Sequence, residues 1–135
     1  FDDLFKVHAA LNCAFQRGGV KVIAYLTPVK EKETLLMADQ LDQELKEAIF
    51  LALESFNKEM GVTAFNLAIY MPPIAPADED WSGFPVMVRL VDRGDPMNRT
   101  ADIGAMELYS ASVIASDPFT VASTLRNHMS HRSAT

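Results

Sequence analysis

Histidine is nearly absent from this sequence of 135 residues. Its histidines are His8, His128 and His131, so the long stretch between Ala9 and Asn127 contains none. A strand inside that stretch therefore has no imidazole that could act as a nucleophile, a general base or a metal ligand. The sequence also lacks a Gly-rich phosphate loop and any serine, histidine and aspartate arrangement typical of nucleophilic catalysis. We therefore expect that this chain alone is not an enzyme.

Cysteine, long apolar runs and excess positive charge are scarce as well. The single Cys13 excludes an intramolecular disulfide, and its amphipathic surroundings predict a small buried hydrophobe. No apolar run approaches the roughly 18 residues of a membrane span, and the acidic start at Asp2 and Asp3 differs from a secretory signal. The net charge of -6 argues against general nucleic-acid binding. We expect a cytoplasmic protein that binds neither nucleic acid nor a membrane.

The length and composition suit one domain. A chain of 135 residues can bury a core, and a hydrophobic content of 49% is ordinary for a globular protein. There is no internal repeat and no linker, so we expect residues 1–135 to form a single domain. Because the first residue is Phe1 rather than methionine, the sequence is open to being a fragment of a longer chain.

The clearest predicted element is a helix from about Asp39 to Met60. Asp39 or Asp42 can cap its start, and Gly61 follows its end. Apolar residues recur at spacings of three and four, which is typical of a helix with one buried face: Leu41, Leu45, Ala48, Ile49, Ala52, Leu53, Phe56 and Met60.

Apolar and β-branched stretches predict strands at Val20–Leu26, Ala64–Tyr70 and Phe84–Gly94. A sheet of this kind can bury the apolar face of the long helix. We expect the helix to pack on five apolar residues of these strands: Val22, Phe65, Leu67, Val86 and Val88. The expected fold class is α+β, an antiparallel sheet with the long helix and further helices packed on it.

The remaining segments predict two further helices, an internal turn and a frayed C-terminal tail. Phe1–Arg17 carries an apolar stripe that stops before Gly18-Gly19, which predicts a helix. Ser116-Asp117-Pro118 is typical of a helix start, with a capping side chain and a proline in the first turn. We expect Lys30–Glu33 to be a solvated turn and His128–Thr135 to be a frayed tail.

Short motifs follow one another along the chain in a recognisable order. They are a strand ending in Pro-Val-Lys, a Phe-Asn-Leu strand, a Trp, an Arg-ending strand, a Gly-to-Glu segment and a closing helix: Tyr25–Lys30, Ala64–Leu67, Trp81, Arg93, Ile103–Leu108 and Asp117–Arg126. Over residues 20 to 127, this order resembles one half of galactose-1-phosphate uridylyltransferase and its relatives in the histidine-triad superfamily. The resemblance implies a histidine-triad-like fold of nucleotidyltransferase ancestry.

The resemblance also reveals a departure. The family's histidine-x-histidine motif falls on Phe84 and Val86 or on Pro85 and Met87, depending on a register shift of one residue. None of these side chains can attack a phosphorus or bind a metal as histidine does. The family's nucleotidyl transfer is therefore lost from this half. Since these uridylyltransferases carry two such halves in one chain, an active half outside this sequence remains open.

Four residues are candidates for binding a ligand: Asn66, Arg89, Arg93 and Glu107. Alternation places Arg89 and Arg93 on one face of the second strand of the pair, with Asn66 and Tyr70 near them on the first. Two guanidinium groups beside an amide can hold the phosphate of a sugar phosphate or nucleotide sugar. The ordinary alternative is that both arginines pair with nearby acids. The resemblance implies that Glu107 accepts sugar hydroxyls; otherwise it is a solvated residue.

His128 and His131 lie three residues apart, which on a helix would place both on one side. No third Cys or His ligand accompanies them, so we expect no metal and no cofactor.

Three functions remain open. The first is a catalytically degenerate nucleotidyltransferase-like domain, which binds a sugar phosphate or nucleotide sugar or supports an active half. The second is an interaction module that forms a homodimer through a sheet or helix face. The third is a hydrolase or transferase whose chemistry the motifs do not reveal.

Overall fold

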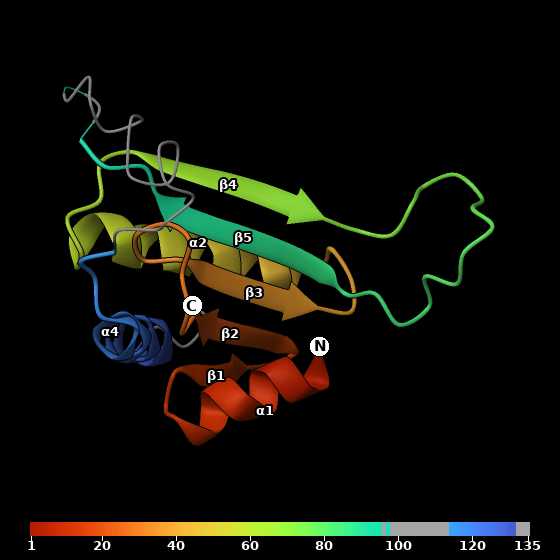
Figure 1. Ribbon diagram of the computed structural model, residues 1–135, viewed down its shortest axis with the longest axis horizontal. Coiled ribbons are helices and arrows are strands. Elements are labelled where there is room, and N and C mark those ends of the chain that lie inside the picture. Colours follow the sequence, from red (N-terminus) through yellow and green to blue (C-terminus); the bar gives the residue numbers. More distant parts are fainter. Residues whose placement is uncertain (96, 98–113, 132–135) are drawn as a thin grey trace.

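The structure, a computed structural model, describes residues 1–95, 97 and 114–131 (Figure 1). Its centre is a five-stranded antiparallel sheet with the strand order β1-β2-β3-β5-β4. The α+β class expected from the sequence is confirmed. The elements are α1 (Asp2–Ala10), β1 (Ala14–Arg17), β2 (Val20–Ala24), β3 (Thr34–Ala38), α2 (Gln43–Lys58), β4 (Phe65–Tyr70), β5 (Val86–Asp92) and α4 (Pro118–His131).

The helices cover the sheet unequally. α2 and α4 share one apolar core with one face of the sheet, and α1 packs on β1 and β2 from the opposite face. Figure 1 shows α2 behind the sheet and α1 in front of it, at the end of the sheet farthest from β4. α1 therefore leaves the front of β4 and β5 uncovered, and it is there that a site can form.

The α2 helix follows the predicted stripe but starts later. Asp42 caps it, because its Oδ1 accepts a hydrogen bond from Leu45 N at 2.9 Å. Leu41 therefore lies before the helix and is 42% exposed. At the other end, Gly61 adopts a φ of 67°, the left-handed conformation that commonly ends helices. The buried face of α2 comprises Leu45, Ala48, Leu51, Ala52, Ser55 and Phe56.

The prediction of the core residues under α2 is wrong for one of the five. Val22, Val86 and Val88 are at most 4% exposed, and Leu67 is half-buried at the edge of the core. Phe65, in contrast, is 47% exposed. β4 is the outermost strand of the sheet, whereas α2 contacts β2 and β3, so the helix does not cover Phe65.

The single N-terminal helix predicted for Phe1–Arg17 is also wrong. α1 ends at Ala10, and the chain then reverses at Asn12, whose φ of 59° is incompatible with a continuing helix. From Ala14 the chain is a strand that pairs with β2. The apolar residues of β1 thus suit both a helix and a strand, and pairing with β2 decides between them.

A two-residue turn connects β1 to β2. Gly18 adopts a φ of 55°, as tight hairpin turns require, and the N–H of Gly19 donates to Glu44 Oε2 at 2.9 Å. A Cβ on Gly18 would lie 2.9 Å from Glu44 Oε1, so glycine is needed there for both space and conformation. β2 ends at Ala24, two residues before the predicted Leu26.

The central strand β3 is not predicted by the sequence. Every residue of Thr34–Ala38 is buried, because helices cover both faces of the sheet at this point. The preceding Lys30–Glu33 segment forms the predicted turn and Lys30 is exposed, but the end of the segment is not solvated as its charges predict. Glu33 is only 4% exposed, because its carboxylate has hydrogen-bond partners inside the fold.

The last helix extends farther than expected. α4 begins as predicted, and the carboxylate of Asp117 accepts the N–H of Thr120 at 3.0 Å. The helix then continues to His131, so the frayed tail predicted from His128 onward is wrong up to that point. Met129 is 1% exposed and anchors the last turn in the core. Residues 132–135 lie outside the described residues.

The segment before β3 is bonded to two distant parts of the chain, the start of α4 and the end of β5. The Glu31 carboxylate accepts the backbone N–H groups of Ala115 and Ser116, which precede α4. The Lys32 ammonium pairs with Asp92 Oδ2 at 2.7 Å, at the end of β5. Burial would raise the pKa of the Glu31 carboxyl, but the hydrogen bonds from Ala115 and Ser116 outweigh it and lower that pKa.

None of the helices in the part of the chain that the structure describes combines the length and apolar character needed to cross a bilayer.

Two phenylalanines on α2 provide a matched test of the core. Phe56 is 1% exposed and Phe50 is 60% exposed. We expect Phe56→Ala to lower the free energy of unfolding by about 3–5 kcal/mol, because it leaves a cavity. Phe50→Ala should change it by less than about 0.5 kcal/mol, as at an ordinary surface position. Denaturant titrations followed by circular dichroism measure both; equal effects would contradict the assigned faces of α2.

The lowered pKa of Glu31 predicts a pH-dependent contribution to stability. A carboxyl whose pKa is lower in the folded state stabilises the fold above its unfolded pKa, near 4.5, and loses that effect as the pH falls through the folded value. Glu31→Gln should therefore cost on the order of 1 kcal/mol at pH 7 and progressively less below pH 4.5. Urea titrations at several pH values measure the difference. A cost that stays constant down to about pH 2 would contradict the ionised hydrogen bonds.

Candidate functional site

The front of β4 and β5 carries the residues singled out in the sequence. The pairing of Asn66 with Val91 and of Ala68 with Arg89 places these side chains on one face of the sheet. It is the face that carries α1, because Arg89 also pairs with Leu35, which belongs to the core beneath α1. Asn66 and Arg89 are therefore brought together, as predicted.

A shallow pocket of about 320 Å³ lies over these residues. Its polar lining comes from Lys30, Asn66, Tyr70 and Arg89, and its apolar lining includes Val29, Ala68 and Val91. The volume is near the lower end of the range of about 300–1,000 Å³ that is usual for small-molecule sites. Two cations, an amide and a phenol around an apolar floor can bind an anion attached to a small ring or chain.

Arg89 has a fixed partner on one side. Its Nε donates to Glu33 Oε1 at 2.7 Å, and the other carboxylate oxygen of Glu33 accepts the N–H of Val29 at 2.7 Å. The hydrogen bond with Glu33 raises the pKa of the Arg89 guanidinium, with a further contribution from the Tyr70 hydroxyl, against the opposing effect of burial. Arg89 thus pairs with an acid, as the ordinary alternative supposed, and it also lines the pocket.

Of the other two predicted site residues, Arg93 does not line this pocket. Arg93 follows the end of β5, where its backbone N–H donates to Ala64 O at 2.9 Å, and it is not among the lining residues. Strand alternation predicts that it lies beside Arg89, but the strand stops at Asp92. Glu107 lies outside the described residues.

Three residues of the site, Lys30, Glu33 and Tyr70, are not among the four binding candidates that the sequence yields. The alternation that selects Asn66 also places Tyr70, four residues along the same strand, near the arginines. Lys30 and Glu33 could not be placed, because both depend on how the segment before β3 folds against β5. A charged residue just before the apolar stretch Leu35–Ala38 is the only available signal for Glu33.

The structure also shows which face of the sheet carries each of the two residue pairs, Phe84 with Val86 or Pro85 with Met87, on which the family's histidine-x-histidine motif could fall. Val86 is buried against the α2 side, whereas Met87 packs with the core on the α1 side. Only the register with Pro85 and Met87 therefore corresponds to the pocket face. Neither residue can supply a nucleophile there.

The histidine at the junction of α2 and α4 is engaged within the fold. His128 Nε2 lies 3.0 Å from Glu54 Oε2, and its Nδ1 lies 3.2 Å from Glu59 Oε1. A concavity of about 520 Å³ beside it is lined by Glu59, Thr124, Asn127, His128 and His131. The described residues contain no group of three His, Cys, Asp or Glu side chains that could hold a metal.

His8 and Cys13 have structural surroundings. His8 is 5% exposed; its Nδ1 lies 2.8 Å from Leu4 O, and its Nε2 accepts the N–H of Leu26 at 3.2 Å. An imidazole with its proton on Nδ1 satisfies both contacts, so His8 has a structural role between the first helix and Leu26. Cys13 is fully buried, as predicted, and burial raises the pKa of its thiol.

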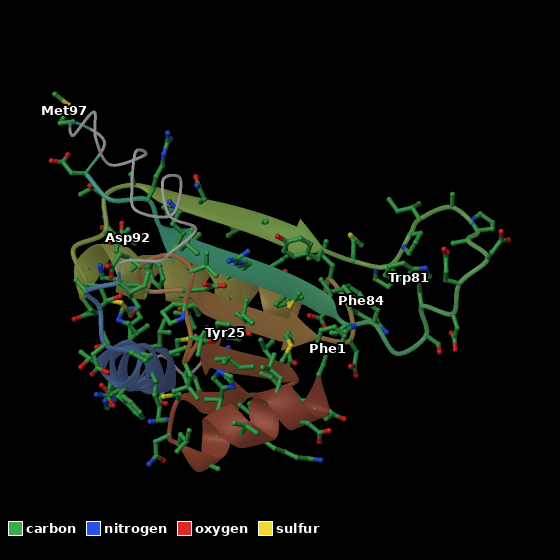
Figure 2. The ribbon with its side chains drawn as sticks, in the orientation of Figure 1. Phe1, Tyr25, Trp81, Phe84, Asp92 and Met97 are labelled. Atoms are coloured by element: carbon green, nitrogen blue, oxygen red, sulfur yellow. The ribbon has the colours of Figure 1, made fainter. Side chains whose placement is uncertain are left out.

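A third hollow, of about 330 Å³, lies where the start of α1 and the end of β3 approach the loop 71–85. Phe84 contacts both Phe1 and Trp81 edge to face, with ring centroids 5.3 Å apart in each pair (Figure 2). Lys21 lines this hollow but is paired with Asp2 at 2.6 Å. Of the predicted binding residues that the structure describes, none lines it: Asn66, Arg89 and Arg93 all lie outside this hollow.

Comparisons with known proteins identify the fold. No protein-family model and no curated protein matches the sequence. A solved structure described as "Structure of uridylyltransferase" is similar, with a TM-score of 0.68 and 11% sequence identity. The similarity covers 96% of this chain but only 45% of that chain, so this chain spans less than half the length of its structural relative. The chain therefore has a uridylyltransferase-like fold, and at this identity the similarity shows the fold alone.

Proposed function

We propose that this chain is a catalytically degenerate, histidine-triad-like nucleotidyltransferase domain that binds a sugar phosphate or nucleotide sugar. The observation that carries the proposal is the position of Arg89, which lines the pocket on β4 and β5 together with Lys30, Asn66 and Tyr70. The fold supports the same assignment, because the similar solved structure is described as a uridylyltransferase.

The local charge of the pocket favours an anionic ligand. The chain as a whole carries a net charge of -6, yet Lys30 and Arg89 both line this pocket. The partner of Arg89, Glu33, is 4% exposed and is not among the lining residues. A phosphate at this place meets cations and hydrogen-bond donors, and among the described residues no acid lines the pocket, although Glu33 pairs with Arg89 beside it.

The sequence supports the loss of catalysis. No histidine occurs between Ala9 and Asn127, so β5 and its neighbours have no imidazole. A domain of this kind can still contribute by holding a ligand or by supporting an active half. The second role fits a chain that spans 45% of its structural relative.

The binding proposal predicts a loss of affinity when Arg89 is removed. Arg89→Ala should weaken the binding of a hexose 1-phosphate or UDP-glucose by about tenfold or more, because a charge-assisted hydrogen bond contributes on the order of 1.5–3 kcal/mol. Isothermal titration calorimetry measures the affinity. Since Arg89→Ala leaves Glu33 without its partner, Asn66→Ala serves as a second variant on the exposed strand β4.

Arg126→Ala is the matched control, because this arginine packs against Phe15 and bonds the carbonyls of Asn12 and Ala14, away from the pocket. It should bind both ligands as the wild type does. The absence of binding heat for the wild type with both ligands would refute the proposal.

Catalytic degeneracy predicts that the purified chain transfers no nucleotidyl group. Incubation with UDP-glucose and a hexose 1-phosphate should give no product above the rate without protein, because there is no histidine nucleophile on the strand. Chromatographic separation of the nucleotide sugars measures the product. Transfer that persists through contaminant controls would contradict this part of the proposal.

One alternative has structural support. β4 is an outer strand without a charged residue, and its apolar side chains Phe65 and Ile69 are 47% and 43% exposed. Exposed apolar edge strands are suited to pairing with another chain, so a homodimeric interaction module would use this edge. Under that alternative, sedimentation gives a dimer mass and the titrations above give no heat.

A further inference from the structure

Glu33 is a buried carboxylate that belongs neither to the pocket lining nor to the apolar core. Its side chain is 4% exposed, whereas that of Arg89 is 35% exposed. Burying a carboxylate is costly unless it is paired and hydrogen-bonded. Glu33 meets both conditions: Oε1 accepts from Arg89 Nε at 2.7 Å, and Oε2 accepts from Val29 N at 2.7 Å. The two bonds connect a strand to a loop.

Both connections lead to the pocket. On the strand side, Glu33 occupies the Nε of Arg89, so the terminal amino groups of the guanidinium are the ones left for a ligand. On the loop side, Glu33 holds the N–H of Val29, and the next residue is Lys30. One carboxylate thus fixes the two elements that bring cations to the pocket lining.

We infer that Glu33 is a positioning residue, which orients Arg89 and the Lys30 loop for binding an anion. The inference rests on the proposed function and adds to it the residue that sets the geometry of the site. Glu33 is itself held in place, because its carbonyl accepts the N–H of Tyr25 at 2.9 Å. A positioned guanidinium loses less side-chain entropy when a phosphate binds than a mobile one does.

Charge alone predicts the opposite effect. Removing the negative charge of Glu33 makes the surroundings of Arg89 more positive, which by Coulomb attraction would tighten the binding of an anion. Removing a positioning residue weakens binding instead. The sign of the change in affinity therefore separates the two roles.

The test compares Glu33→Gln with Glu31→Gln. Both variants neutralise a carboxylate in the same segment, but Glu31 bonds Ala115 and Ser116 rather than Arg89. We expect Glu33→Gln to weaken the binding of a hexose 1-phosphate by about tenfold, and Glu31→Gln to change it less than about twofold. Because a structural role would also lower stability, thermal unfolding of both variants is measured alongside.

A second readout follows Arg89 directly. In a nitrogen-15 NMR spectrum, the Nε–H of Arg89 should exchange slowly with water in the wild type and in Glu31→Gln, and faster in Glu33→Gln. If Glu33→Gln does not fold, Glu33→Asp keeps the charge but shortens the side chain, and it should also weaken binding. In a protein that already carries Arg89→Ala, adding Glu33→Gln should lower the affinity little further, since both changes break the same interaction between Arg89 and Glu33.

The possible failures are distinguishable. If the wild type binds and Glu33→Gln binds equally well or more tightly, the positioning role is refuted while the proposed function stands. If the wild type binds neither a hexose 1-phosphate nor UDP-glucose, the proposed function fails, and the Arg89 Nε–H signal then decides the positioning role. An unchanged signal in Glu33→Gln would refute that role; faster exchange would support it.

Discussion

The fold depends on the bonds made by three consecutive charged residues, Glu31, Lys32 and Glu33. Each side chain reaches a different place: the start of α4, the end of β5 at Asp92, and the middle of β5 at Arg89. The segment directly precedes the central strand β3, so these bonds fix the sheet and the last helix relative to each other. A partly desolvated network of this kind is stable only when every member has its partner.

The pocket exists because the helices do not cover the whole sheet. α1 is short and lies over β1 and β2, while α2 and α4 occupy the other face. β4 and β5 consequently present a half-exposed surface, where Asn66 and Tyr70 need no burial and Arg89 can keep one side in water. The same geometry leaves the outer edge of β4 exposed, and it is the reason why we propose ligand binding and, as the alternative, strand pairing.

The sequence predicts those parts whose signal is local. The long helix and the strands β4 and β5 follow from periodicity, and alternation brings Asn66 and Arg89 together. β3 is not predicted because a short strand buried on both faces does not alternate. The charges around Glu33 indicate a solvated turn because its partner Arg89 is 56 residues away, and Arg93 is misplaced because alternation does not continue beyond the end of β5.

The position of the only tryptophan determines what optical spectroscopy can report on this molecule. Trp81 lies in the loop between β4 and β5, contacts Phe84 edge to face, and is 37% exposed (Figure 2). Its emission therefore senses the conformation of that loop, not the packing between α2 and the sheet. A fluorescence transition in this protein would record the loss of these loop contacts, whereas circular dichroism follows the helices and the sheet directly.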